Sequence, residues 1–583
     1  MAISVPERSS LPIGARDAIG TRAWEWPLNP AAHMAVVFLI FTCATAAFFW
    51  QWLPNLSIAL IGPPEDNMQD LWNTWYAAFA PRDGSFFYTH LLRFPEGTSL
   101  LYHSFAYPQV LAVALLTKVF NLSPSTLLLQ QNLSLLASFP LAGTGAYFLV
   151  RHFISHAAGA LLGGFVFAFS PSHVEHVMHH AHVSQVEFIP FFVLAYLLAI
   201  ERKSLLWLGA AVALFVLNAL SCWYYLFYIG YFMVFHTLYI AIRERSLPWG
   251  WRLAVPLTCV LGVIALLSPL LVPMVSMAEH GASVYERGTD LYVANVFAYW
   301  AFPPFHLLGD LSRGIYARIL GSNEWEATVY LGLVNLLALA WLAVRGSLAE
   351  RRLLLYVLCG MLVFCIFASG DSLHVLRHRV MPMPDVLLSQ LPFFRNVRTP
   401  ARAIVFVYLF LGIGVGCAAA LAWSRPARSA SYWLAMAAAA LIVLDFYPAR
   451  ELPSTALVCS PGLRVIRDDP EKGFGVLDLP RGQPVDYYAG NLFMFQQACH
   501  GRPIAEGNTS RNVAVSLRDH LQTGDLDAQR EQLARARVKY IVINQRPMGI
   551  EMPWYPADGQ EAQYLATYPV VYAGPELTVL RVY

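Results

Sequence analysis

Residues 34–53 read MAVVFLIFTCATAAFFWQWL, a stretch with no charged side chain. A helix of about 20 apolar residues is long enough to cross the hydrocarbon core of a bilayer. Ten further apolar runs follow, at 126–150, 153–171, 183–200, 205–221, 222–242, 253–276, 328–344, 352–368, 402–424 and 431–447. We therefore expect an all-α polytopic membrane protein with about 11 transmembrane helices.

The composition supports this fold class. Of 583 residues, 57% are hydrophobic and 13% charged, whereas soluble proteins average about 45–50% and about 25%. So few charges cannot cover the surfaces of several soluble domains, which excludes a cytosolic enzyme, a disulfide-rich secreted protein and a disordered chain. A net charge of +2 gives no basic footprint for nucleic acid.

Positively charged joints between the runs predict the topology, because short basic loops face the cytoplasm. Successive joints enclose two runs each, so all can lie inside, together with an N-terminal tail over 1–33. The short run 106–120 would break this parity, and we interpret it as re-entrant or interfacial. The joints are Arg151–His152, Arg202–Lys203, Arg243–Arg252, Arg345–Arg352 and Arg425–Arg428.

The chain divides into a transmembrane region, 34–447, and a polar C-terminal region, 448–583. Three long external loops interrupt the first region, at 54–105, 277–327 and 369–401. The second has strand-like runs at 474–480, 539–544 and 576–583 and a charged helical stretch at 516–537. It predicts a small extracytoplasmic α/β domain, in which Cys459 and Cys499 could pair in an oxidising compartment.

Acidic side chains follow the first span in GPPEDNMQDLWNTWY, residues 62–76. On a helix Asp66 and Asp70 lie on one face, next to Glu65, and paired carboxylates suit a general base or a cation site. The alternative, favoured by composition alone, makes Asp66 an N-cap and Asp70 a first-turn acid. Trp72 and Trp75 fit an interfacial aromatic belt or stacking on a sugar.

A histidine cluster occupies SPSHVEHVMHHAHVSQVEFIP, residues 170–190. On a helix His176, His179 and His180 share a face, a spacing that could bind zinc. No cysteine or HExxH pattern accompanies them, so hydrogen bonds to a phosphate, or a place in the headgroup layer, are favoured instead. His182 belongs to the same cluster.

Arginines precede a late span in FFRNVRTPARAIVF, residues 393–406. The parity argument places Arg398 and Arg402 outside, against the usual charge bias. A forked guanidinium suits a phosphate or pyrophosphate. Binding to lipid headgroups is an equally open alternative.

In this order the motifs resemble bacterial membrane glycosyltransferases of the GT-C superfamily, in an uncharacterised branch similar to YfhO-like and ArnT-like proteins. The motifs are DNMQDLW (66–72), FPEGTSL (94–100), SPSHVEHVMHHAH (170–182), RTPAR (398–402), VLDLP (476–480) and YIVI (540–543).

The resemblance implies transfer of a hexosyl or pentosyl group, with inversion, from a polyprenyl-phosphate donor to a lipid, glycan or protein acceptor. The reaction would take place on the outer face of the bacterial inner membrane. Asp66 takes the position of the family's catalytic base, with Glu65 and Asp70 as alternates, although the glycine that follows this acid in the family is Asn67 here.

We expect the three clusters to meet at one outer cavity, where arginine and histidine side chains would stabilise the departing phosphate by charge-assisted hydrogen bonds. A divalent metal is left open. We expect the donor phosphate to be bound by Arg93, His176, His182, Arg398 and Arg402, and the substrates to contact Trp72, Trp75, His103 and Glu187.

Two other functions remain as alternatives. A transporter or flippase could relay protons through acids and histidines, but few charges lie within the spans and no pair of broken helices repeats. A non-catalytic membrane subunit of envelope glycan assembly would instead present residues 448–583 to a partner.

Overall fold

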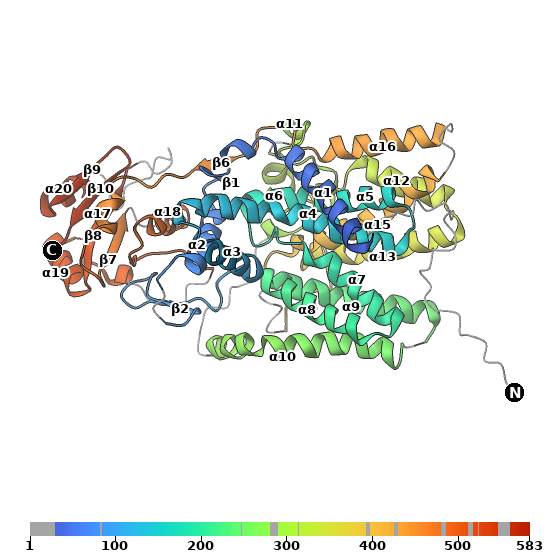
Figure 1. Ribbon diagram of the computed structural model, residues 1–583, viewed down its shortest axis with the longest axis horizontal. Helices are drawn as coiled ribbons and strands as arrows, with labels where there is room; N and C mark the ends of the chain where they lie inside the picture. The colour runs from blue at the N-terminus through green and yellow to red at the C-terminus, as the bar shows by residue number, and fades with distance from the viewer. Residues whose placement is uncertain are drawn as a thin grey trace.

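The computed structural model describes residues 29–583 apart from 82–83, 247, 280–289, 313, 392–393, 395–396, 425–429, 480–484, 511–516, 523 and 546–559. A bundle of helices runs along the long axis, and a sheet-containing domain lies at one end (Figure 1). Most of the predicted tail 1–33 and the basic joint Arg425–Arg428 lie outside the described residues.

Within the described residues, six helices are long and apolar enough to cross a membrane. A seventh candidate is the pair α5 (Ala157–Ala168) and α6 (Pro171–His179), which is bent by 40° at its break. The protein is therefore a mostly helical, multi-span membrane protein. The six are α1 (Pro30–Phe48), α4 (Leu127–Phe153, with a preceding turn), α9 (Trp223–Glu244), α10 (Trp251–Glu279), α13 (Leu348–Ala368) and α15 (Ile404–Trp423).

The other predicted runs are also helical but shorter. The run 106–120 forms α3, which ends where Asn121 adopts a left-handed conformation. The number of helices that cross, the topology and the domain boundaries stay predictions. These shorter helices are α3 (Tyr107–Phe120), α7 (Phe188–Arg202), α8 (Leu205–Ser221), α12 (Leu333–Arg345) and α16 (Ala430–Phe446).

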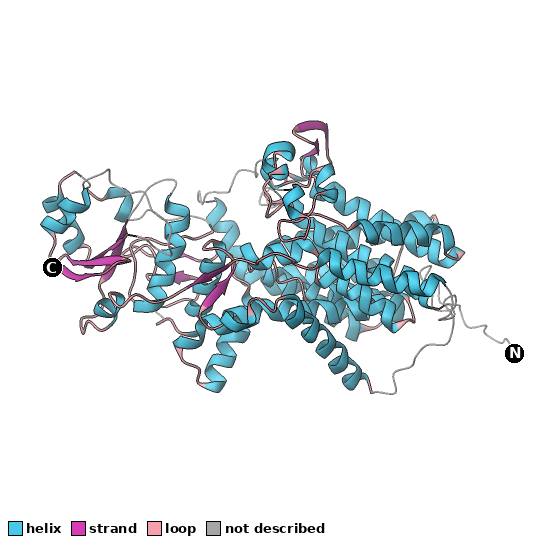
Figure 2. Ribbon diagram, turned by 90° about the horizontal axis from the view of Figure 1, so that it is seen from above, coloured by secondary structure: helices cyan, strands magenta, loops and turns pink. Residues whose placement is uncertain are grey.

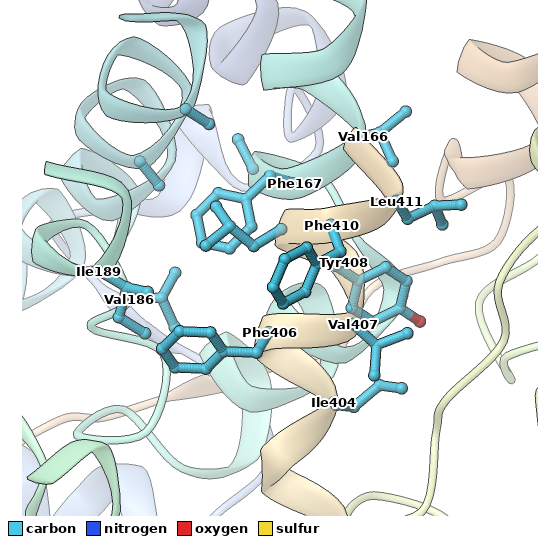
Figure 3. Packing of buried hydrophobic residues seen from close by; sticks show 14 of the residues in the cluster. Val166, Phe167, Val186, Ile189, Ile404, Phe406, Val407, Tyr408, Phe410 and Leu411 are labelled. Carbon is cyan, nitrogen blue, oxygen red and sulfur yellow. The ribbon is translucent and has the colours of Figure 1, made fainter. Parts of the chain in front are cut away.

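Helix α15 lies at the centre of the bundle, packed closely against α5. Gly163 faces Gly412, and a Cβ atom on Gly163 would lie 2.4 Å from the Gly412 carbonyl oxygen. Such small residues let transmembrane helices approach closely. Phe167 of α5 and Phe406 of α15 belong to the apolar cluster that fills the neighbouring space (Figure 3).

The three long loops predicted to be external carry short elements. In the first loop, β1 (Ala59–Ile61) leads into α2 (Asp66–Ala78), and β2 (Tyr88–Thr89) pairs with β3 (Thr98–Ser99). Strand β1 pairs antiparallel with β6 (Ser454–Ala456). The first loop is thus joined to the start of the C-terminal region. The later loops contain α11 (Gly309–Ser312), β4 (Ser372–Val375), β5 (His378–Pro382) and α14 (Asp385–Leu388).

The C-terminal region has a four-stranded mixed sheet in the order β7-β8-β10-β9. Figure 2 shows strands lying among helices near the C-terminus. Strands β7 and β8 pair in parallel, and the other two pairings among these described strands are antiparallel. The three predicted strands are confirmed, and Cys459 forms a disulfide with Cys499. The strands are β7 (Gly475–Leu479), β8 (Val538–Asn544), β9 (Val570–Ala573) and β10 (Leu577–Arg581), and the helices are α17 (Leu463–Arg467), α18 (Val485–His500), α19 (Leu526–Arg535) and α20 (Gln560–Thr567).

Candidate functional site

The start of α2 places three acidic side chains against the histidine segment. The helix begins at Asp66, so Asp66 is its first helical residue, and Glu65 stands at the N-cap position without a capping hydrogen bond. The alternative in which Asp66 caps the helix is therefore wrong. Asp70 lies one turn further along, where α2 passes the end of α6.

Each of the three acids faces a different imidazole. Glu65 Oε2 lies 3.0 Å from His179 Nδ1. Asp66 Oδ2 lies 3.6 Å from His180 Nε2, and Asp70 Oδ2 lies 3.4 Å from the Nδ1 atom of His182. The Asp66 side chain is 22% exposed, against 12% for Glu65 and 8% for Asp70, so Asp66 is the most accessible of the three.

Asn67 fixes α2 against α6. Its side-chain amide donates to the carbonyl oxygens of Ile61, Val177 and Met178 at 2.8–2.9 Å, and its Oδ1 accepts from Ala181 N–H. These bonds provide a physical reason for asparagine where the resembling family has glycine.

A buried ion pair closes the inner side of the site. Arg402 Nε donates to Glu326 Oε2 at 2.9 Å, and Arg402 Nη2 donates to Glu326 Oε1. His176 Nε2 lies 3.1 Å from Oε2 and His180 Nε2 lies 3.4 Å from Oε1 of the same carboxylate. Burial raises the pKa of Glu326, but Arg402 and His180 outweigh it and hold that pKa well below its usual range.

The structure corrects the expected histidine face. Helix α6 ends at His179, which turns toward Glu65 and stacks on Trp325 at a ring separation of 4.6 Å. In the part of the chain that the structure describes, the one group with metal-ligand spacing is instead His176, His180 and Glu326, whose donor atoms lie within 4.8 Å of one another.

This donor set is chemically suited to zinc, but its carboxylate is already engaged. Both oxygens of Glu326 accept hydrogen bonds from the guanidinium of Arg402, and a metal ion would bring a second cation against that charge. The residues in this arrangement fit an ion pair rather than a metal centre.

Asp70 also lines a small polar cavity. Thr74, Gln131, His182 and Gln185 share the cavity wall. His103 lies nearby and is 1% exposed. Burial, and secondarily the proximity of His182, lower the pKa of His103 to about 3.

The two predicted stacking residues are buried. Trp72 is fully buried, stacks on Tyr76, and donates from Nε1 to Gln497 Oε1 of α18 at 2.7 Å. Trp75 is 3% exposed. In this structure neither indole presents an open face to a sugar.

Three other predicted residues remain to be placed: Glu187, Arg93 and Arg398. Glu187 is buried and accepts from Gln109 of α3. Arg93 is bonded through its backbone N–H to the Glu506 carbonyl in the C-terminal region. Arg398 is exposed.

The structure thus brings together Glu65, Asp66, Asp70, His176, His182 and Arg402 from three separate segments. Sequence reasoning missed Glu326, since a single glutamate in a long loop has no diagnostic spacing. It also missed the structural role of Asn67. An asparagine where the resembling family has glycine was a signal that could have revealed this role.

Comparison with known proteins agrees with this fold. Residues 35–447 match the family model "Domain of unknown function (DUF6311)". No curated protein sequence matches the chain. The arabinofuranosyltransferase AftD from Mycobacteria superposes with a TM-score of 0.56 at 12% identity, covering 95% of this chain and 42% of AftD. This chain thus spans less than half the length of AftD.

Two further solved structures resemble the chain more distantly. The oligosaccharyltransferase AglB from Archaeoglobus fulgidus, solved with an inhibitory peptide and a dolichol-phosphate, has a TM-score of 0.47 at 12% identity over 88% of this chain and 69% of AglB. ArnT from Cupriavidus metallidurans has a TM-score of 0.41 at 12% identity, over 95% of this chain and 99% of ArnT. The expected structural similarity to GT-C glycosyltransferases is thus confirmed for the fold, across most of the chain. The family model covers well over half of the chain and shows that the protein belongs to the family described as Domain of unknown function (DUF6311).

Proposed function

We propose that this protein transfers a sugar from a polyprenyl-phosphate donor to an acceptor hydroxyl on the outer face of the bacterial inner membrane. The proposal combines the GT-C fold with the cluster of acids and imidazoles at the outer end of the bundle. Asp66 is the catalytic base of the proposed transfer, and Glu65 and Asp70 have other roles.

The observation that carries the proposal is the position of Asp66. Its carboxylate is the most exposed of the three acids and lies 3.6 Å from His180. Glu65 is engaged by His179 at 3.0 Å. Asp70 accepts a hydrogen bond from Asn73 as well as facing His182. A general base must reach the proton that it removes, and Asp66 is the best placed of the three for an incoming acceptor.

The donor phosphate needs cationic or N–H groups close to this carboxylate. His180 faces Asp66 and His182 faces Asp70, and Arg398 is an exposed residue shortly before α15. Arg402 is held by Glu326, so its charge is already balanced. We therefore assign the phosphate to His180, His182 and Arg398, and assign Arg402 to the support of the site.

The reaction balances without a further reactant. Asp66 accepts the proton of the acceptor hydroxyl while that oxygen forms a bond to the anomeric carbon. The bond from this carbon to the phosphate oxygen breaks, and polyprenyl phosphate leaves with the electron pair. Attack opposite to the leaving group inverts the configuration of the sugar. Charge-assisted hydrogen bonds in a site of low dielectric stabilise the departing phosphate.

The disulfide supports the proposed orientation. Cys459 and Cys499 are paired, and disulfides persist in oxidising compartments such as the periplasm. A periplasmic C-terminal domain is consistent with the basic joints lying in the cytoplasm. The outer ends of α2 and α6 would then face the same compartment.

The proposal is tested by donor binding and transfer with purified protein. A panel of polyprenyl-phosphate sugars is offered to the wild type, to Asp66→Asn and to Glu531→Gln, a control that changes an exposed acid of α19. We expect all three to bind a donor, and only the wild type and the control to transfer or hydrolyse it. Transfer by Asp66→Asn at the wild-type rate would remove Asp66 as the base. Donor movement across vesicles without transfer would favour a flippase.

A further inference from the structure

A chain of hydrogen bonds leads from the C-terminal region to the Asp70 carboxylate. The backbone N–H of Ser510 donates to His103 Nδ1 at 3.3 Å. His103 Nε2 lies 2.7 Å from Asn73 Oδ1. Asn73 Nδ2 donates to Asp70 Oδ1 at 3.1 Å. Three segments that lie far apart in the sequence therefore meet at one carboxylate.

The direction of each bond follows from the donor at the start. A backbone N–H can only donate, so His103 Nδ1 must accept, and the proton of the neutral ring is on Nε2. That Nε2–H donates to Asn73 Oδ1, which orients the Asn73 amide so that its nitrogen faces Asp70. The same nitrogen donates to the Ser104 carbonyl at 2.9 Å.

His103 is suited to this connecting role because it stays neutral. It is 1% exposed, and burial, followed by the nearby His182, lowers its pKa to about 3. Gln69 Nε2, which can only donate, lies 3.1 Å from the same Nδ1 atom. The ring therefore keeps one tautomer at neutral pH.

At the other end, Asp70 holds His182. Asp70 Oδ2 lies 3.3 Å from the backbone nitrogen of His182 and 3.4 Å from its Nδ1 atom. A carboxylate that accepts from Nδ1–H fixes the tautomer and the orientation of an imidazole. The Nε2 atom of His182 is then the ring nitrogen that can meet a phosphate or a hydroxyl.

We propose that Ser510, His103 and Asn73 are positioning residues, which hold Asp70 so that it orients His182, and that the C-terminal region thereby takes part in forming the transfer site. This inference rests on the proposed function for the meaning of "transfer site". The hydrogen-bonded chain itself can be tested without activity.

His103 offers a matched pair of substitutions. A glutamine can place an amide N–H near the position of Nε2 and keep the bond to Asn73. It has no acceptor at the position of Nδ1, but it does not need the Ser510 N–H, because that bond sets the tautomer of a ring and an amide has no tautomer to set. An asparagine can reach only the position of Nδ1, so it keeps an acceptor for Ser510 and loses the donor to Asn73. Gln497→Leu is the control for domain packing, because Gln497 joins the same two regions through Trp72 but does not contact the chain.

The experiment measures two quantities in the wild type and in His103→Gln, His103→Asn and Gln497→Leu. The first is kcat and KM for sugar transfer. The second is the rate at which diethyl pyrocarbonate modifies His182 at pH 7, read by peptide mass spectrometry. We expect His103→Asn to lower kcat about tenfold with KM within about twofold, and to change the modification rate of His182 by about threefold or more.

His103→Gln and Gln497→Leu are expected to stay within about twofold of the wild type in both measurements. Equal behaviour of the two His103 variants would overturn the inference, as would the same loss in Gln497→Leu. If the wild type transfers no sugar from any donor, the proposed function fails, and the reactivity of His182 still decides the positioning chain.

Discussion

Helices α5 and α6, the bent pair, differ in the contacts that they make: those of α5 are apolar and those of α6 are polar. Helix α5 packs against α15 through glycines, with the Gly163 position closed by the Gly412 carbonyl. Helix α6 instead presents His179 to Glu65, at the N-cap position of α2, and His176 to Glu326, the partner of Arg402. The first contact depends on side-chain size, and the second depends on charges from distant segments.

The difference teaches where each kind of information lies. Side-chain size and hydropathy are local properties of the sequence, so the apolar helix α5 is predictable from its own residues. The polar contacts of α6 form only with residues from other segments, which are the loop after α1, the loop before α12 and the start of α15. They cannot be predicted from the residues of α6 alone. Substitutions in the two helices should therefore fail in different ways.

The largest effect is expected in the apolar helix α5. Gly163→Val would place a side chain against the backbone of Gly412, 2.4 Å from its carbonyl oxygen at Cβ. Because neither backbone can move without opening the α5–α15 contact, we expect a loss of more than about 5 kcal/mol and no folded protein in detergent. Folded yield, measured by size-exclusion fluorescence, checks this.

Gly209→Ala is the matched control in α8, since a Cβ atom there would meet no heavy atom within 4 Å. Its yield should equal that of the wild type. A normal yield of Gly163→Val would contradict the packing account.

The next effect is expected from the ion pair. Glu326→Gln leaves the buried guanidinium of Arg402 without its counter-charge, which costs about 3–5 kcal/mol. A double variant, Glu326→Leu with Arg402→Met, removes both charges and should recover part of the lost stability. Thermal unfolding in detergent gives both values. If Glu326→Gln were fully stable and bound donor more tightly, Arg402 would be a phosphate ligand instead.

A smaller effect is expected at Asn67, whose hydrogen bonds hold α2 against α6. Asn67→Ala removes the four hydrogen bonds of a buried side chain, and we expect a loss of about 2–3 kcal/mol. Asn67→Asp should be worse, because a carboxylate would face three carbonyl oxygens that it cannot bond. Equal melting temperatures for Asn67→Asp and the wild type would disprove this role.

The smallest effect is expected in the C-terminal domain. Burial raises the pKa of Asp469, but hydrogen bonds from Lys539 and Tyr540 outweigh it and lower this pKa to about 2. A depressed folded-state pKa stabilises the fold above the unfolded value, and this contribution is lost as the pH falls through the folded value.

Asp469→Asn should therefore cost about 1 kcal/mol at pH 7. The difference from the wild type should shrink between about pH 4 and pH 2, as chemical unfolding at several pH values would show. A difference that is constant with pH would mean that the side chain acts through packing.

Much of the fold could be predicted from local pattern. Each apolar run is a helix, and VLDLP and KYIVIN are strands, because hydropathy and β-branched residues act over short ranges. The break between α5 and α6 falls inside a predicted span, next to Pro171. The sequence predicts three polar clusters that meet at one outer cavity, but it does not predict which side chains pair there.

The pairing could not be derived because its partners are far apart in the chain. Glu326 reaches Arg402 across 76 residues, and Ser510 reaches His103 across 407. His103 is expected from the sequence at a substrate, whereas its connecting position depends on a bond from Ser510 in the C-terminal region. A tryptophan beside acids likewise predicts stacking on a sugar, whereas the Trp72 indole is buried and donates a hydrogen bond to Gln497 of the C-terminal region.

The most direct test of the central claim compares Asp66→Asn with Asp70→Asn in one transfer assay, with donor binding measured in parallel. If Asp66 is the base and Asp70 orients His182, Asp66→Asn should lose about 10²–10⁴-fold in kcat, and Asp70→Asn about tenfold. A larger loss in Asp70→Asn, with Asp66→Asn close to the wild type, would contradict the account.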